Sequence, residues 1–270
     1  MYRKFKVDIN DINSIFQNRI YDKQKYLCNE INSELEDFWK RLESGKAISA
    51  ENIISEWFPR VQADVFLSHS HQDKDEVIQF ANYLYQEFGL KAFIDSEVWL
   101  YMNNLLKGID DRYCYSYEDN TYSYEKRNNS TAHVHTILMT ALTRMIDTTE
   151  CVIFINSENT TISVENGISE TNSPWIYLEL MVNNIINQQK LKRKIWTHSY
   201  IFAQESTQLR KSASDIIDIH YETTGLLTTF QHLSAKRVQL WEMYCKKFED
   251  ELSEDAMNLD VLYKDTLYDN

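Results

Sequence analysis

Short apolar runs that alternate with helical patterns constrain the fold of this chain more than any other feature. Residues 63–68, 91–95 and 150–156 form runs of strand length, each dominated by β-branched, aromatic or small apolar side chains. Between them, apolar residues recur at three- and four-residue spacing over 74–88 and 132–147, which predicts helices. Strands that alternate with helices form right-handed crossovers, so we expect an α/β fold with a parallel sheet and helices on both faces.

The remainder of the chain continues the same pattern less regularly. A helix is expected over about 174–189, strands over 195–202 and 216–220, and a last amphipathic helix over 235–252. Gly89 directly follows the first helix and is expected to cap its carboxyl end.

The two ends of the chain read as additions to this domain. Residues 8–58 carry apolar side chains at helical spacing until Pro59 interrupts them, which predicts helices with a packing or oligomeric role. The expected organisation is a helical extension over 1–60, an α/β domain over 61–233 with an insertion at 96–131, and a helix with an acidic tail over 234–270.

Charge and cysteine usage restrict partners and compartment. The 41 acidic side chains against 28 basic ones give a net charge of -13, which disfavours nucleic acid and anionic membranes as partners. The four cysteines are scattered and the N-terminus does not resemble a signal peptide, so we expect a cytoplasmic protein with free thiols. The most apolar run, 151–155, is too short to span a bilayer.

The sequence lacks the motifs that are typical of several enzyme classes. The chain contains neither GxGxxG nor GxxxxGK[ST], which disfavours a dinucleotide-binding dehydrogenase and a P-loop NTPase. It also lacks the GxSxG elbow of α/β-hydrolases.

Four blocks, in order along the chain, carry a family resemblance. They are the strand and loop at 64–75, Phe93-Ile94-Asp95, residues 141–156, and Ser173-Pro174-Trp175-Ile176-Tyr177-Leu178-Glu179-Leu180. Together they resemble Toll/interleukin-1 receptor (TIR) domains, over roughly residues 63–222. The resemblance implies a flavodoxin-like sheet. The insertion at 96–131 departs from the bare family domain and is similar to bacterial antiphage TIR proteins of the Thoeris type.

The resemblance also implies an activity. Enzymatic TIR domains cleave the nicotinamide–ribose bond of NAD, giving nicotinamide and an ADP-ribose-type signal, with NAD as substrate and no further cofactor. The expected partners are NAD, a downstream effector protein that senses the product, and further copies of the chain. The competing interpretation is a non-catalytic TIR adaptor that acts by protein–protein assembly.

Glu179 is the expected catalytic residue, because it matches the family glutamate four residues after Trp175. On a helical wheel it flanks an apolar arc, a position partly removed from water. The alternative is a solvated helix glutamate, which is the usual fate of this residue type. The arc comprises Leu178, Met181, Val182, Ile185 and Ile186.

The other expected site residues lie near the carboxyl ends of the strands, where ligands bind in open α/β sheets. The first loop offers Ser68, His69, Ser70 and His71 to the nucleotide. Phe66 and Trp175 offer rings to a base, with core packing as the alternative for Phe66, and Asp95 ends the second strand.

The histidine-rich loop after the first strand and the tyrosine-rich insertion each allow an alternative interpretation. His69-x-His71-x-Asp73 nearly matches a metallohydrolase loop, but Lys74 occupies the place of the last ligand, so no metal is expected there. The tyrosine-rich insertion is expected to be ordered, either as a lid over the cleft or as a surface or oligomer contact.

Overall fold

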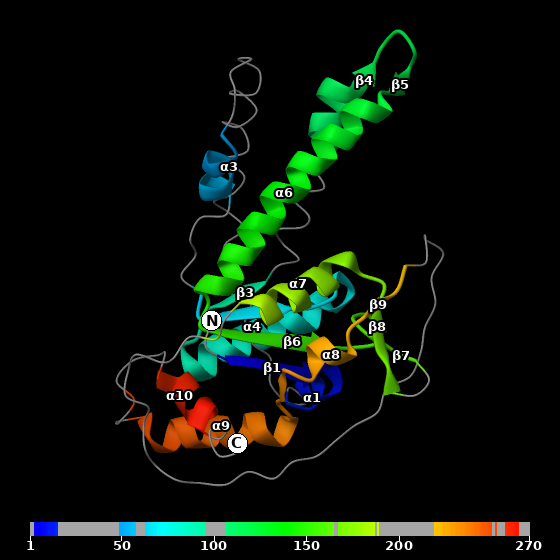
Figure 1. The fold of residues 1–270 in the computed structure, drawn as a ribbon. Coiled ribbons are helices and arrows are strands. Elements are labelled where there is room, and N and C mark those ends of the chain that lie inside the picture. Colours follow the sequence, from blue (N-terminus) through cyan, green and yellow to red (C-terminus); the bar gives the residue numbers. More distant parts are fainter. Residues whose placement is uncertain are drawn as a thin grey trace. The chain divides into compact units, whose positions relative to one another are not determined.

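The computed structural model describes most of the α/β domain and parts of both ends. The described residues are 3–15, 49–57, 63–94, 106–164, 167–186, 188, 219–249, 252 and 257–264. Contacts divide the chain into two compact units, the first comprising 1–23, 62–94 and 146–270, the second 24–61 and 95–145 (Figure 1).

The first unit is built on a sheet of five parallel strands. Their order across the sheet is β10-β1-β6-β2-β3. β2, β3 and β6 are successive strands of this sheet along the chain and stand in the order β3-β2-β6, as in flavodoxin-like folds. The expected α/β class with a parallel sheet is therefore confirmed. The strands are β1 (Arg3–Asp8), β2 (Val65–Ser68), β3 (Ala92–Ile94), β6 (Cys151–Asn156) and β10 (Gln231–His232).

One face of this sheet packs into a large hydrophobic cluster. Alternate residues of the inner strands, Phe5 and Val7 among them, point into one cluster with four helices. Trp241 stacks on Phe88 with ring centroids 3.9 Å apart, and Phe5 stacks on Tyr263. The helices are α1 (Ile9–Ile15), α4 (Lys74–Phe88), α9 (Ala235–Lys247) and α10 (Met257–Lys264).

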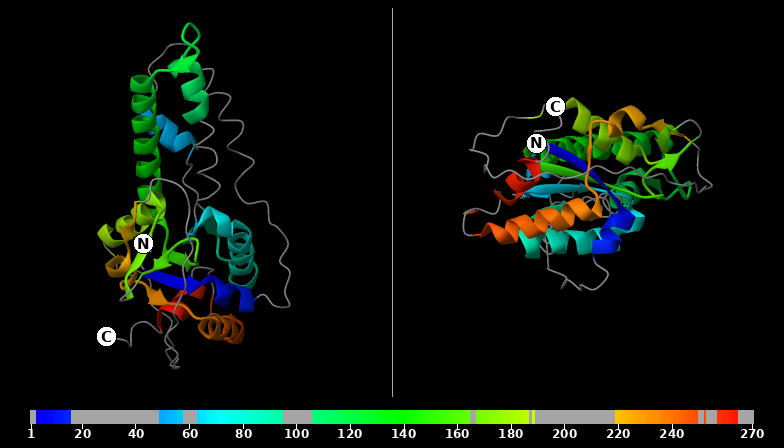
Figure 2. Two further views of the ribbon diagram at one scale, coloured as in Figure 1. Left: turned by 90° about the vertical axis from the view of Figure 1, so that its right-hand side faces the viewer. Right: turned by 90° about the horizontal axis from the view of Figure 1, so that it is seen from below.

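The opposite face is covered by α7 (Pro174–Ile185), with the short α8 (Thr224–Leu227) beside it. The right-hand view of Figure 2 shows α7 and α8 on one side of the sheet and α4 and α9 on the other. Helices on both faces are thus also confirmed. A small antiparallel sheet adjoins α7 and consists of β7 (Ile162–Ser163), β8 (Ser169–Thr171) and β9 (Tyr221–Glu222).

The regular parts of the sequence pattern predicted their elements well. The α4 helix and the strands β2, β3 and β6 are found where expected. Gly89 caps α4 at a φ of 67°, with its N–H bonded to the carbonyl of Tyr85. The strand expected at 195–202 lies outside the described residues, as does most of 216–220, and the described strand nearest to the latter is β9.

The N-terminal prediction is wrong for Arg3–Asp8. This segment is β1, an inner strand between β6 and β10, and pairs with β6 from Arg3↔Cys151 to Asp8↔Asn156. Its alternation of Lys4 and Lys6 with apolar neighbours has the period of a strand. The helical part of the prediction is confirmed for α1 and for α3 (Ala50–Trp57).

The C-terminal segment is likewise part of the core and not an appended tail. Trp241 of α9 and Tyr263 of α10 are both fully buried in the cluster beneath the sheet. The acidic composition of this segment predicted a tail and gave no sign of the helix α10, whose residues 259–263 are all buried.

The second unit contains the described part of the insertion. It consists of α3, the one-turn η2 (Asp110–Cys114), the hairpin of β4 (Tyr115–Ser116) and β5 (Thr121–Tyr122), and α6 (Tyr124–Thr148) up to residue 145. The α6 helix begins before the predicted residue 132, because Arg127 and Ser130 both contact Asp110 and so tie its first turns to η2.

No helix in the described ranges combines the length and the apolar character needed to cross a membrane. The cysteines found in these ranges, Cys114, Cys151 and Cys245, are buried and free. Burial raises the pKa of the Cys245 thiol to about 12, so this sulfur stays protonated at neutral pH.

The position of β1 predicts that its core side chains are essential for stability. Phe5→Ala removes a fully buried ring that stacks on Tyr263, and such truncations cost about 3–5 kcal/mol. Tyr117→Ala is the control, because Tyr117 is 88% exposed and its loss is expected to cost less than about 0.5 kcal/mol. Urea unfolding measures both, and equal small losses would show that the N-terminal segment lies outside the core.

Candidate functional site

The start of α7 follows directly from its sequence. Ser173 has extended backbone angles and its Oγ accepts the N–H of Ile176 at 3.3 Å, which makes it the N-cap. Pro174 occupies the first helical position, where a missing N–H has no consequence. The Ser-Pro pair therefore fixes where the helix that bears Glu179 begins.

The face that α7 turns toward the sheet is not the predicted one. Glu179 is only 1% exposed and Asn183 is buried beside it, whereas Ile185 of the predicted apolar arc is 70% exposed. The helical wheel ranked side chains by hydrophobicity alone and did not include the partners offered by the sheet. The buried residues of α7 are Ile176, Glu179, Leu180, Val182 and Asn183.

Ser68 is the described partner of the Glu179 carboxylate. The hydroxyl of Ser68, the last residue of β2, donates to Oε2 of Glu179 at 2.5 Å, and both side chains are buried. A hydrogen bond to a buried carboxylate is short and strong, and it fixes the orientation of the acceptor. The alternative of a solvated helix glutamate is therefore wrong.

Lys4 holds the other end of α7. Its buried ammonium donates to the backbone carbonyl of Asn183 at 3.1 Å and to Oδ1 of Asn184 at 3.0 Å, and lies over the ring of Phe230. Burial lowers the pKa of this side chain. A cation at the last carbonyls of a helix also offsets the negative end of its dipole.

These two contacts give the direction of α7. Ser68 ends β2 and meets Glu179, whereas Lys4 lies near the start of β1 and meets Asn183. The helix therefore begins at the carboxyl edge of the parallel sheet and runs back toward the amino edge. The carboxyl edge is where ligands bind in open α/β sheets, so the first turns of α7 border the expected crevice.

The first loop places its residues in different environments. His69 is buried, and its Nδ1–H donates to the carbonyl of Leu67 at 3.1 Å, since a carbonyl can only accept. Ser70 caps the short η1 (His71–Asp73) by accepting the N–H of Gln72, and His71 is exposed. These three residues follow directly after Ser68, whose hydroxyl donates to Glu179 at the carboxyl edge of the sheet.

The structure places the remaining predicted site residues in different environments. Trp175 is partly buried and lies four residues before Glu179 on α7. Phe66 is fully buried and stacks on Phe93 at 5.6 Å, which agrees with the core-packing alternative for its ring. Asp95 lies outside the described residues.

The residues of the metallohydrolase-like loop each have separate contacts. Asp73 is buried and accepts from Ser157 Oγ at 2.5 Å and from Asn159 Nδ2 at 2.6 Å. These bonds tie η1 to the segment after β6, while His69 bonds to its own strand. Asp73 therefore stabilises the loop.

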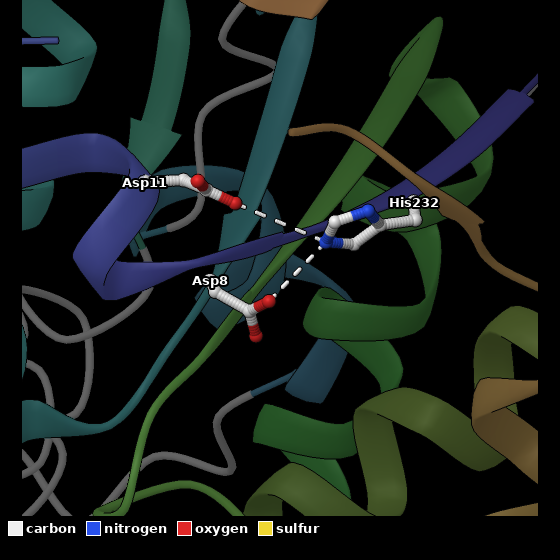
Figure 3. Close-up of side chains that lie close together, drawn as sticks. All are labelled: Asp8, Asp11 and His232. Carbon is white, nitrogen blue, oxygen red and sulfur yellow. Dashed lines mark hydrogen bonds and ion pairs between the residues drawn. The ribbon is translucent and has the colours of Figure 1, made fainter. Parts of the chain in front are cut away.

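The sequence pattern missed a second polar group at the same edge of the sheet. Nε2 of His232 lies 3.2 Å from Oδ2 of Asp8 and 3.9 Å from Oδ2 of Asp11 (Figure 3). Burial raises the pKa of Asp11, and the nearby charge of Asp8 raises it further. Asp8 and His232 are 224 residues apart, so only recognition of β1 as a strand could have brought them together.

Comparisons of this chain with protein-family models, with curated proteins and with solved structures find no match.

The Ser68–Glu179 hydrogen bond is expected to be important for stability. Ser68→Ala leaves a buried carboxylate without its hydroxyl donor, which costs about 1–3 kcal/mol. Ser116→Ala is a matched control, because Ser116 donates to Asp119 in an exposed pair that contributes little. Chemical unfolding of both variants measures the difference, and equal costs would contradict the burial of the Glu179 pair.

Proposed function

We propose that this chain is a TIR-family enzyme that cleaves the nicotinamide–ribose bond of NAD, with Glu179 as the catalytic carboxylate. The observation that carries the proposal is the buried Glu179 on α7, held by Ser68 near the carboxyl edge of a parallel sheet. The four sequence blocks that resemble TIR domains include both residues.

This geometry suits the chemistry of the cleavage. Breaking the bond leaves positive charge on the ribose in an oxocarbenium-like transition state, and a carboxylate beside it stabilises that charge. Nicotinamide leaves as a neutral molecule, so no general acid is needed. Ser68 fixes the carboxylate beforehand, which avoids reorganisation during the reaction.

Substrate would approach along the first turns of α7. Trp175 lies one turn before Glu179, and in this proposal its ring would contact nicotinamide or shield the carboxylate until NAD binds. His69, Ser70 and His71 follow β2 at the same edge and would contact the ribose and the phosphates. Capture of the ribose by water gives ADP-ribose, and capture by an adenine nitrogen gives a cyclic product.

The biological setting follows from the resemblance to Thoeris-type proteins. The ADP-ribose-type product would act as a signal to a downstream effector protein during bacterial antiphage defence. The competing proposal is a TIR adaptor that works by assembly, in which Glu179 serves only to hold α7 against Ser68. The two proposals differ in what happens when the charge of Glu179 is removed.

Glu179→Gln is expected to reduce NAD consumption by on the order of 100-fold or more, because it removes the charge that stabilises the transition state. The glutamine retains an oxygen that accepts from Ser68, so we expect thermal unfolding close to that of the wild type. Glu222→Gln, on the exposed end of β9, is the matched control and should retain full activity. Product analysis by mass spectrometry measures the rates, and a Glu179→Gln variant within a few-fold of wild type contradicts the assignment.

The proposed chemistry uses no metal at Glu179. Dialysis against EDTA is therefore expected to leave the rate of NAD cleavage unchanged, measured at a temperature well below unfolding. A rate that falls with EDTA and returns with added zinc, while the protein stays fully folded and an Asp11→Asn variant behaves in the same way, would instead place a metal in the reaction.

A further inference from the structure

Asp8, Asp11 and His232 converge from three elements of the first unit. Asp8 ends β1, Asp11 lies in α1, and His232 ends β10 (Figure 3). One ligand atom from each lies within 4.8 Å of the other two. We propose that these three side chains form a binding site for one divalent transition-metal ion of the zinc class.

The distances suit such an ion. Zinc binds imidazole nitrogen and carboxylate oxygen at about 2.0–2.2 Å in a tetrahedron, which places neighbouring ligand atoms about 3.3 Å apart. His232 Nε2 already lies 3.2 Å from Asp8 Oδ2 and 3.9 Å from Asp11 Oδ2. Side-chain shifts of less than about 1 Å would complete the geometry and leave the fourth position for water.

Neighbouring groups orient both carboxylates. Asn156 Nδ2 donates to Oδ1 of Asp8 at 2.6 Å, and Thr161 Oγ1 donates to Oδ1 of Asn156, also at 2.6 Å. Asp11 accepts a hydrogen bond from the backbone N–H of Ala235, in the first turn of α9. Outer contacts that hold one carboxylate oxygen while the other faces a histidine are typical of metal sites.

Charge and exposure agree with the proposal. With a neutral imidazole the group carries two negative charges in close proximity, and a divalent cation neutralises both. The side chains retain 27% of their exposure at His232, 18% at Asp8 and 28% at Asp11, so an ion can enter from solvent. The guanidinium of Arg237 approaches the backbone of this group, since its Nη1 donates to the carbonyl of His232 at 3.1 Å.

The donor set identifies the class of metal. One imidazole and two carboxylates without a thiolate favour zinc, manganese or cobalt over copper(I), and the imidazole disfavours magnesium. β6 lies between β1 and β2, so this site is two strand spacings, about 9–10 Å, from the strand that bears Ser68. The ion would tie β1, α1 and β10 together and is independent of the proposed cleavage at Glu179.

Zinc binding to the full chain tests the proposal without NAD. The protein is stripped with EDTA, freed of chelator, and titrated with zinc chloride while calorimetry and thermal unfolding are followed. We expect one zinc ion per chain, a rise in the unfolding temperature, and no displacement by excess magnesium. His232→Ala and Asp11→Asn should each weaken zinc binding at least tenfold.

His220→Ala is the matched control. His220 pairs with Glu170 at 2.9 Å but belongs to no described group with a second carboxylate, so its loss should leave zinc affinity unchanged. Asp11→Asn retains an acceptor for the Ala235 N–H. It therefore still tests zinc binding at this site if His232→Ala fails to fold. Absence of zinc binding by the wild type, or equal binding by a folded Asp11→Asn variant, overturns the proposal.

Discussion

The pairing of β1 with β6 over six residues is the interaction on which the rest of the first unit depends. Its apolar residues, Phe5 and Val7, complete the core beneath the sheet. At its start Lys4 donates to the backbone carbonyl of Asn183 in α7, and at its end Asp8 meets His232. Through a single strand, the N-terminus supports the core, the helix that bears Glu179 and the proposed zinc site.

The contact between α7 and the sheet is polar where hydrophobic packing would be the simpler solution. Burying Glu179 and Asn183 removes a carboxylate and an amide from water, which costs free energy unless they find partners. The hydrogen bond from Ser68 to the carboxylate, and the bond from Asn183 Nδ2 to the backbone carbonyl of Glu179, reduce that cost. Apolar side chains of the same size nevertheless often give equal or greater stability. A buried carboxylate retained at the carboxyl edge is therefore better explained by chemistry than by stability, which favours the catalytic proposal over the adaptor.

The sequence predicted the secondary structure correctly where one apolar pattern runs through a whole segment. β2 and β6 are continuous apolar runs and α4 has a clear helical repeat ending at Gly89, so local pattern predicted all three. β1 was missed because its lysines alternate with apolar residues and the helical pattern that follows at Ile9 dominated the reading.

At the candidate site, too, local sequence patterns could not predict a contact between distant segments. The spacing from Trp175 to Glu179 identified the residue, and the strand end at Ser68 identified its surroundings. Their direct hydrogen bond could not be predicted, because it depends on the rotation of α7 about its own axis. That rotation is set by the polar residues of the sheet, which lie far from α7 in the sequence.

Side chains alternate along the strands of this unit, so the two faces of the sheet carry different residues. Phe5, Val7, Val65 and Leu67 point to the helix-covered core, while Lys4, Asp8 and Ser68 point to the face of α7. Register partners on parallel strands point the same way, so His232, opposite Lys6, lies on this second face as well. A shift of β1 by one residue would bury Lys4 and Lys6 in the core and turn Phe5 toward α7. The register that fills the core thus also directs Lys4 toward α7 and brings Asp8 to His232.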